Sequence, residues 1–165
     1  MKKEALFFAT KSGATKEVCD LISKELKIEL FDIKELSKEE LSKKIASFDK
    51  VIFATSSYGF GELSDEWKSK IATLSEVNFK DKTVALVGVG NQERHGDSFC
   101  SAMVDFLPKI KGASLVGQTE TDGYKFKLSS AFINGKFIGL CVDFKGDTKW
   151  QERVKNWCKN LKNNF

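Results

Sequence analysis

ALFFATKSGAT, residues 5–15, is the stretch that decides the fold of this chain. Its apolar first part, residues 5–9, is typical of a buried strand, and a helical pattern of apolar residues begins directly afterwards and runs to residue 26. The short segment between them is rich in hydroxyl groups, from Thr10, Ser12 and Thr15. This order predicts a strand, a tight loop and the start of a helix.

The loop between that strand and helix favours a bound phosphate group. A helix N-terminus presents unpaired backbone N–H groups and the positive end of the helix dipole, and both stabilise an anion. The loop lacks the endings of the nucleotide-hydrolysing P-loop and of the dinucleotide fingerprint, since Lys11 lies inside it and Gly13 is its only glycine. A phosphomonoester held without magnesium therefore fits better than ATP or NAD. The alternative is an ordinary capped turn without a ligand.

Length and composition predict one globular domain over residues 1–165. No apolar run approaches the ~18 residues of a membrane span, and the N-terminus lacks a signal-peptide pattern, so we expect a cytoplasmic protein without a membrane partner. The four cysteines show no metal-ligand spacing and there is a single histidine, which argues against a metal site. Reduced and mostly buried thiols are the expected state of these cysteines.

The net charge of +4 is unevenly spread along the chain. Residues 1–100 hold 16 basic and 17 acidic side chains, whereas residues 101–165 hold 11 basic and 6 acidic ones, a balance of +5. The lysines are scattered and do not alternate with aromatic residues, so no nucleic-acid motif accompanies the charge. We expect a solvated basic face and no nucleic-acid partner.

Strand and helix patterns alternate along the whole chain, which predicts a doubly wound α/β fold with a parallel sheet. Asn134-Gly135 is a tight-turn signal inside a short excursion that interrupts the fifth strand. The expected strands are 4–9, 28–33, 50–56, 83–89 and a fifth that is split between 113–119 and 136–142. The expected helices lie near 14–27, 38–47, 64–75, 98–110 and 147–162.

In such a fold a ligand lies beyond the carboxyl ends of the strands, where three loops of this chain should meet. They are residues 10–15, 55–63 and 88–97. The second and third loops each carry a planar side chain on a glycine-rich turn, Tyr58 and His95, which indicates stacking against a flat ligand. A phosphate tail together with a planar head points to flavin mononucleotide (FMN).

The same loops resemble those of the long-chain flavodoxins, and the resemblance runs from residue 4 to the C-terminal helix pattern. Residues 10–15, TKSGAT, resemble the phosphate loop T-x-T-G-x-T, and residues 57–63, SYGFGEL, followed by Trp67, resemble T-W-x-x-G-E-L…W. Residues 88–92, GVGNQ, resemble G-T-G-D-Q. Residues 121–124 and 134–140 resemble the insertion that separates long-chain from short-chain members.

This resemblance implies a flavodoxin-like five-stranded parallel sheet of order 2-1-3-4-5, with helices on both faces and an insertion that splits the fifth strand. It also implies bound FMN and one-electron transfer through the semiquinone/hydroquinone couple, in a carrier that serves redox enzymes and is not itself an enzyme. The implied partners are a flavodoxin reductase-type donor and a redox-enzyme acceptor, and the implied state is a monomer.

The resemblance also assigns residues to parts of the cofactor. The hydroxyls and amides of the first loop would hold the phosphate, and Ser57 would face the ribityl chain. Tyr58 and His95 would flank the isoalloxazine ring, with Asn91 near its pyrimidine edge. The complete expected set is Thr10, Lys11, Ser12, Gly13, Ala14, Thr15, Ser56, Ser57, Tyr58, Gly59, Phe60, Gly61, Val89, Gly90, Asn91, His95, Ser98 and Cys100.

The chain departs from the family pattern at several of these positions. Tyr58 replaces a frequent Trp, His95 replaces the usual Tyr, and Ala14 replaces a frequent Asn that helps to fix the phosphate loop. Cys100 replaces a polar residue near the flavin rim, although packing is the simpler role for it. Most flavodoxins are acidic and this chain is basic, which puts the family's usual docking charges in doubt.

Two other functions share this architecture. A phosphoacceptor receiver domain needs clustered carboxylates after the first strand and an aspartate at the end of the third, but Thr10-Lys11 and Thr55-Ser56 stand there. An FMN enzyme such as a quinone reductase needs one open flavin face, whereas Tyr58 and His95 would close both. Flavin absorbance, and then NAD(P)H oxidation without a partner, would separate these alternatives.

Overall fold

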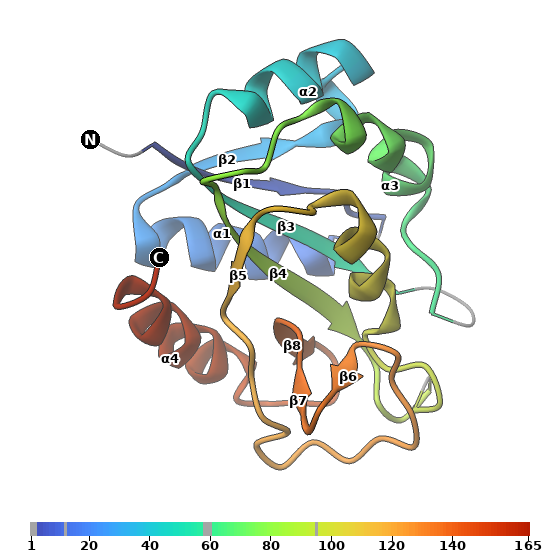
Figure 1. The fold of residues 1–165 in the computed structure, drawn as a ribbon. Coiled ribbons are helices and arrows are strands. Elements are labelled where there is room, and N and C mark those ends of the chain that lie inside the picture. The colour runs from blue at the N-terminus through green and yellow to red at the C-terminus, as the bar shows by residue number, and fades with distance from the viewer. Residues whose placement is uncertain (1–2, 12, 58–60, 95) are drawn as a thin grey trace.

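The structure is a computed structural model that describes residues 3–11, 13–57, 61–94 and 96–165, and strands and helices alternate along most of it (Figure 1). The strands are β1 (Glu4–Phe8), β2 (Glu29–Asp32), β3 (Lys50–Ser56), β4 (Thr83–Gly90), β5 (Ser114–Val116), β6 (Phe132–Ile133), β7 (Lys136–Phe137) and β8 (Leu140–Asp143). The α-helices are α1 (Ala14–Leu26), α2 (Lys38–Ala46), α3 (Asp65–Lys70) and α4 (Trp150–Lys162). Three 3-10 helices are η1 (Ile33–Glu35), η2 (Ile71–Glu76) and η3 (Ser101–Lys109).

The central sheet has the order β2-β1-β3-β4-β5, and all its pairings are parallel. This is the order expected from the sequence. Each connection crosses the sheet through a helical segment, so the carboxyl ends of β1, β3 and β4 lie at one edge. The ligand-binding loops expected from the sequence follow these three strands.

The fifth position of the sheet is shared by two strands, as expected, but the second of them begins at Leu140 and not at residue 136, because Lys136–Phe137 pair with β6 in a hairpin. β5 pairs with residues 83–85 of β4, and β8 pairs with residues 87–90 of the same strand. Residues 117–139, which we call the insertion, leave the sheet between them and form the β6–β7 hairpin. The hairpin turns at Asn134-Gly135, where both residues have a positive φ (55° and 80°).

Helices cover both faces of the sheet (Figure 1), and a hydrophobic core lies on each face. On one face α1 and α4 lie side by side, and residues such as Ile22 and Trp157 pack on Leu6 and Val87. On the other face α2, α3, η2 and η3 cover Phe7, Phe53 and Leu86. Inside-pointing side chains thus alternate along each strand between the two cores. No helix in the described ranges is long and apolar enough to cross a bilayer.

Two expected helices differ in type from a regular α-helix. The helix expected at 64–75 divides into α3 and the 3-10 helix η2, and the one expected at 98–110 is the 3-10 helix η3. Pro108 lies inside η3 and has no N–H to donate to the carbonyl four residues earlier. Hydrogen bonds between residues three apart, such as the one from the Ile110 N–H to the Leu107 carbonyl, replace the α-helical pattern there.

Candidate functional site

The loop after β1 forms an open cradle at the N-terminus of α1. Gly13 caps the helix with φ 92°, a left-handed conformation that side chains disfavour, and an added Cβ would meet no atom within 4 Å. The Gly13 N–H donates to the Thr10 Oγ1 at 3.0 Å, which closes the turn. The first N–H groups of α1 have no partner within the helix, so they are available to an anion in this cradle. Ala14 is half-buried, Thr15 is buried and Lys11 is exposed.

The end of β3 contributes three hydroxyl side chains with different surroundings. The Ser57 N–H donates to the Val89 carbonyl, and the Ser57 Oγ accepts from the Ala102 N–H at 3.1 Å. The Thr55 Oγ1 donates to the Ser56 carbonyl. The Ser56 Oγ is buried and has no hydrogen-bond partner among the described residues. A buried hydroxyl without a partner is costly, so it is a natural contact for a ligand at this edge.

Gly61 brings the loop after β3 against the start of η3. Its φ is 90°, and a Cβ there would lie 2.8 Å from the Ser101 Cβ and 3.3 Å from the Ser98 Cβ. Only glycine meets both the backbone requirement and the space available. Ser98 is itself buried at this contact. The loops after β3 and β4 are therefore packed together, as the sequence predicted for a shared site.

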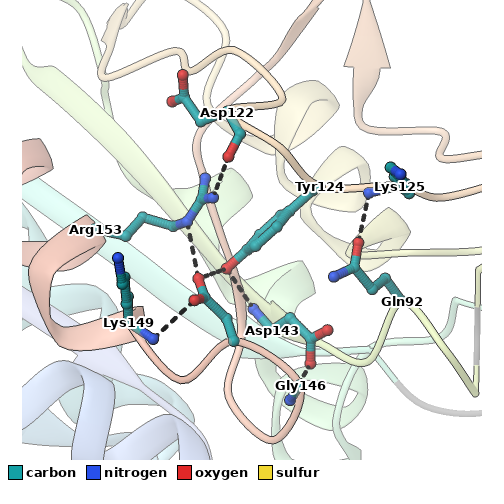
Figure 2. A network of polar contacts seen from close by, with 9 residues as sticks. Gln92, Asp122, Tyr124, Lys125, Asp143, Gly146, Lys149 and Arg153 are labelled. Atoms are coloured by element: carbon teal, nitrogen blue, oxygen red, sulfur yellow. Dashed lines mark hydrogen bonds and ion pairs between the residues drawn. The ribbon is translucent and has the colours of Figure 1, made fainter.

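The loop after β4 is held by side-chain amides. The Asn91 Oδ1 accepts from the Glu93 and Arg94 N–H groups at 3.0 and 2.9 Å, which forms a turn directly after Gly90. The Gln92 Oε1 accepts from the Lys125 N–H at 2.6 Å and ties this loop to the insertion (Figure 2). These hydrogen bonds fix Asn91 directly after β4, at the carboxyl edge of the sheet.

The side chain of Cys100 points into the core. It is 0% exposed and has φ 53°, and a Cβ placed on Gly90 would lie 3.2 Å from its Sγ. Burial raises the pKa of the neighbouring Cys141 thiol, and a hydrogen bond with Cys100 raises it further. Cys100 can therefore contribute to a ligand site only through its backbone in this arrangement. All four cysteines are buried and unpaired.

Five of the expected site residues lie outside the described residues. They are Ser12, Tyr58, Gly59, Phe60 and His95. The structure describes the other thirteen, which come from the loops and strand ends after β1, β3 and β4. Their placement at one edge follows the sequence expectation, whereas the roles of the individual residues toward a cofactor stay predictions.

A polar network beside this edge was not anticipated from the sequence (Figure 2). The Tyr124 hydroxyl accepts from the Asp143 N–H at 3.0 Å and donates to the Asp147 Oδ2 at 2.7 Å. The Arg153 Nε donates to the same Asp147 oxygen, and its Nη2 donates to the Asp122 carbonyl. The guanidinium carbon lies 3.6 Å from the centre of the Tyr124 ring. The network joins the insertion, the end of β8 and α4.

Electrostatic effects in this network follow from burial and hydrogen bonding. Burial raises the pKa of Tyr124 well above its ordinary value, which keeps the phenol a neutral donor. Burial also acts to raise the pKa of Asp147, but hydrogen bonds from Tyr124, the Lys149 N–H and Arg153 outweigh it and lower that pKa. Asp143 is 0% exposed, and its Oδ2 has no hydrogen-bond partner within the described ranges.

A groove of about 740 Å³ lies on the other side of this network, between α4 and residues 117–122. Its walls include Gln118, Lys149 and Asn156, and the Trp157 Nε1 donates to the Gly117 carbonyl in it. It lies away from the three loops at the carboxyl edge. We therefore place the candidate site at the loops, where the cradle and the Ser56 hydroxyl without a partner among the described residues occur, and not at this groove.

A doubly wound parallel sheet whose loops form an anion cradle at the carboxyl edge defines a flavodoxin-like α/β protein. A family model described as Flavodoxin matches residues 6–157 of the chain. The flavodoxin of Helicobacter pylori is 36% identical over 167 aligned residues, with 100% of this chain and 99% of that protein covered. The flavodoxin of Haemophilus influenzae is 35% identical, with 94% and 91% covered. The chain belongs to the flavodoxin family.

A solved structure supports the same assignment. The crystal structure of Fusobacterium nucleatum flavodoxin bound to flavin mononucleotide has a TM-score of 0.91 to this chain at 34% identity. The alignment covers 100% of this chain and 99% of that one. The fold is thus that of an established member of the family.

Proposed function

We propose that this chain is an FMN-containing one-electron carrier that uses the semiquinone/hydroquinone couple. It accepts electrons from a flavodoxin reductase-type donor and passes them to a redox-enzyme acceptor. The observation that carries the proposal is the anion cradle at Gly13, together with the unpaired Ser56 hydroxyl at the same edge of the sheet. FMN supplies the redox chemistry when it is bound.

Different residues of the chain bind different parts of that cofactor. The amides at the start of α1, with the hydroxyls of Thr10, Ser12 and Thr15, bind the phosphate. Ser57 would face the ribityl chain, the Ser56 hydroxyl would contact the cofactor at the same edge, and Asn91 would lie near the pyrimidine edge. Tyr58 and His95, which lie outside the described residues, would flank the isoalloxazine ring. The complete proposed set remains Thr10, Lys11, Ser12, Gly13, Ala14, Thr15, Ser56, Ser57, Tyr58, Gly59, Phe60, Gly61, Val89, Gly90, Asn91, His95, Ser98 and Cys100.

The proposed setting is that of a monomer in the cytoplasm. Four buried and unpaired cysteines suit a reducing compartment.

Purification followed by absorbance and mass spectrometry of the released chromophore tests the cofactor. We expect a yellow protein that releases FMN, and a protein that fails to bind added FMN would overturn the proposal. Anaerobic reductive titration, followed by absorbance, then tests one-electron behaviour. Rapid NAD(P)H oxidation without a reductase would instead favour an FMN enzyme with its own substrate.

A further inference from the structure

The insertion exposes two large apolar side chains that the core does not use. Leu128 is 64% exposed and Ile133 is 40% exposed, and these are the large hydrophobic residues most open to solvent in the described ranges. Single exposed apolar residues are common on protein surfaces. Here, however, both fall within six residues of one segment, and that segment adjoins the proposed cofactor site.

The same segment carries positive charge without compensation. Lys125, Lys127 and Lys136 are exposed, and none of them belongs to an ion pair among the described residues. No Asp or Glu occurs from residue 123 to residue 142. We call the surface formed by Lys125, Lys127, Leu128, Ile133 and Lys136 the insertion face.

A cluster of aromatic rings fixes the segment from the inside. The Phe126 ring lies 5.1 Å from Phe137, 5.5 Å from Phe132 and 5.8 Å from Phe99, measured between centroids. Phe99 and Phe137 are fully buried. The exposed residues are thus not needed to cover this cluster, and they are presented on an ordered platform. Binding to a preorganised face costs less conformational entropy.

Hydrogen bonds attach the insertion face to the loop after β4. The Gly96 carbonyl accepts from the Lys127 N–H at 2.6 Å and from the Leu128 N–H at 2.9 Å. The Phe99 N–H donates to the Leu128 carbonyl at 3.2 Å. Residue 95, the histidine expected beside the flavin, is the direct neighbour of Gly96. Leu128 is therefore held against the loop that should border the cofactor.

We propose that the insertion face is a docking surface for a redox protein with an acidic rim around an apolar centre. This inference rests on the proposed electron-carrier function. Exposed lysines attract such a partner and orient it, while Leu128 and Ile133 supply the desolvated contact at the centre. A protein partner fits better than a nucleic acid, because the aromatic rings of this segment pack against one another, with Phe137 fully buried and Phe126 and Phe132 half-buried, and so present no row of exposed rings for bases to stack on.

The test uses the full chain loaded with FMN and an acidic rubredoxin as the electron acceptor. The variant Lys125→Glu/Lys127→Glu reverses two charges on the insertion face. The control Lys80→Glu/Lys111→Glu makes the same charge change at the opposite end of the sheet, where both lysines are exposed. Stopped-flow absorbance after anaerobic reduction measures the second-order rate constant over a range of ionic strength.

We expect the insertion variant to slow transfer by about tenfold at low ionic strength, with a much smaller effect of the control, and the difference should vanish in high salt. Leu128→Ser should slow transfer several-fold at every ionic strength, because salt does not screen an apolar contact. Equal slowing by both double variants, or by neither, would overturn the docking proposal.

Two further measurements separate the possible failures. FMN content and the flavin spectrum are recorded for each protein, so that loss of the cofactor, which would contradict the proposed function, is distinguished from loss of docking. Binding of a short DNA duplex is measured in parallel. If the insertion variant abolishes DNA binding and leaves electron transfer unchanged, the face is a nucleic-acid site and the docking proposal is wrong.

Discussion

Gly13 gives the loop after β1 the backbone conformation that turns the first N–H groups of α1 toward the cradle. An added Cβ at Gly13 would meet no atom within 4 Å, so the substitution Gly13→Ala causes backbone strain without a steric clash inside the protein. Gly135 in the β6–β7 turn has the same open surroundings and a similar positive φ, so it provides a matched control.

We predict that Gly13→Ala and Gly135→Ala each lower the free energy of unfolding by about 1–2 kcal/mol, the cost of a left-handed non-glycine residue. Only Gly13→Ala should weaken FMN binding, and it should weaken riboflavin binding less, because riboflavin lacks the phosphate. Urea denaturation and quenching of flavin fluorescence measure the two effects. Equal FMN affinity in both variants would contradict the placement of the phosphate.

Ser56 and Ser57 are adjacent hydroxyls with opposite surroundings. The Ser56 Oγ has no hydrogen-bond partner within the part of the chain that the structure describes, whereas the Ser57 Oγ accepts from the Ala102 N–H. In the protein without FMN, we predict that Ser57→Ala lowers the free energy of unfolding by about 1 kcal/mol and that Ser56→Ala leaves it unchanged or raises it. FMN affinity should fall in Ser56→Ala. A large loss of stability from Ser56→Ala without FMN would show that this hydroxyl has a partner in the folded chain.

At the scale of elements, the Tyr124 hydroxyl connects the insertion to β8 and to the segment before α4 (Figure 2). Tyr124→Phe keeps the ring on Phe99 and beneath Arg153, but leaves the buried Asp143 N–H without an acceptor. We predict a loss of about 1–3 kcal/mol in the free energy of unfolding. Amide hydrogen exchange should become faster in the insertion. An unchanged exchange rate there would mean that the aromatic cluster alone holds it.

Asp147 in the same network makes stability depend on pH. Its pKa is lower in the folded chain than in the unfolded chain, so its contribution is full above the unfolded value of about 4 and is lost as pH falls toward the folded value. Asp147→Asn should therefore cost most near neutral pH. We predict that the difference in unfolding free energy from the unmutated chain narrows between about pH 5 and pH 3. A constant difference over that range would exclude Asp147 as the titrating group.

The elements that the sequence predicted well are those with strong local patterns. The apolar runs of β3 and β4, the stripe of α4 and the Asn134-Gly135 turn are all visible in short windows. The Tyr124 network was missed because its partners are separated by about twenty residues or more and come from three elements. The 3-10 geometry of η3 and the left-handed conformation of Cys100 depend on tertiary packing. Pro108 is the one signal in the sequence against a regular α-helix over η3.

For the molecule as a whole, the structure refines the charge imbalance expected from the sequence. Acidic residues near the proposed cofactor site are partly neutralised, since Glu62 pairs with Lys68 at 2.6 Å and Glu66 pairs with Lys70 at 3.3 Å. The insertion face has no such compensation. Part of the acidic charge near the proposed cofactor site is therefore compensated by neighbouring lysines.

We predict that a basic flavodoxin reductase reduces this protein with a rate constant that rises or stays level as salt increases. Attraction between opposite charges is weakened by screening, so a steep fall with salt would reveal an acidic docking surface after all. The measurement is the initial rate of flavin reduction by the reductase with NADPH over a range of ionic strength. A strongly acidic flavodoxin serves as the control and should slow markedly in salt.

The divided fifth strand has a consequence for the evolution of the sequence. Val116 is opposite Ala85 and Leu140 is opposite Val87, so only the position beside Leu86 separates the ends that flank residues 117–139. One residue in place of the insertion would join β5 and β8 into one continuous strand. The insertion thus leaves and rejoins the sheet at almost the same point, although its hydrogen bonds to Gln92 and Gly96 also attach it to the loop after β4. A change in the length of the insertion can therefore leave the pairing of β5 and β8 with β4 in place.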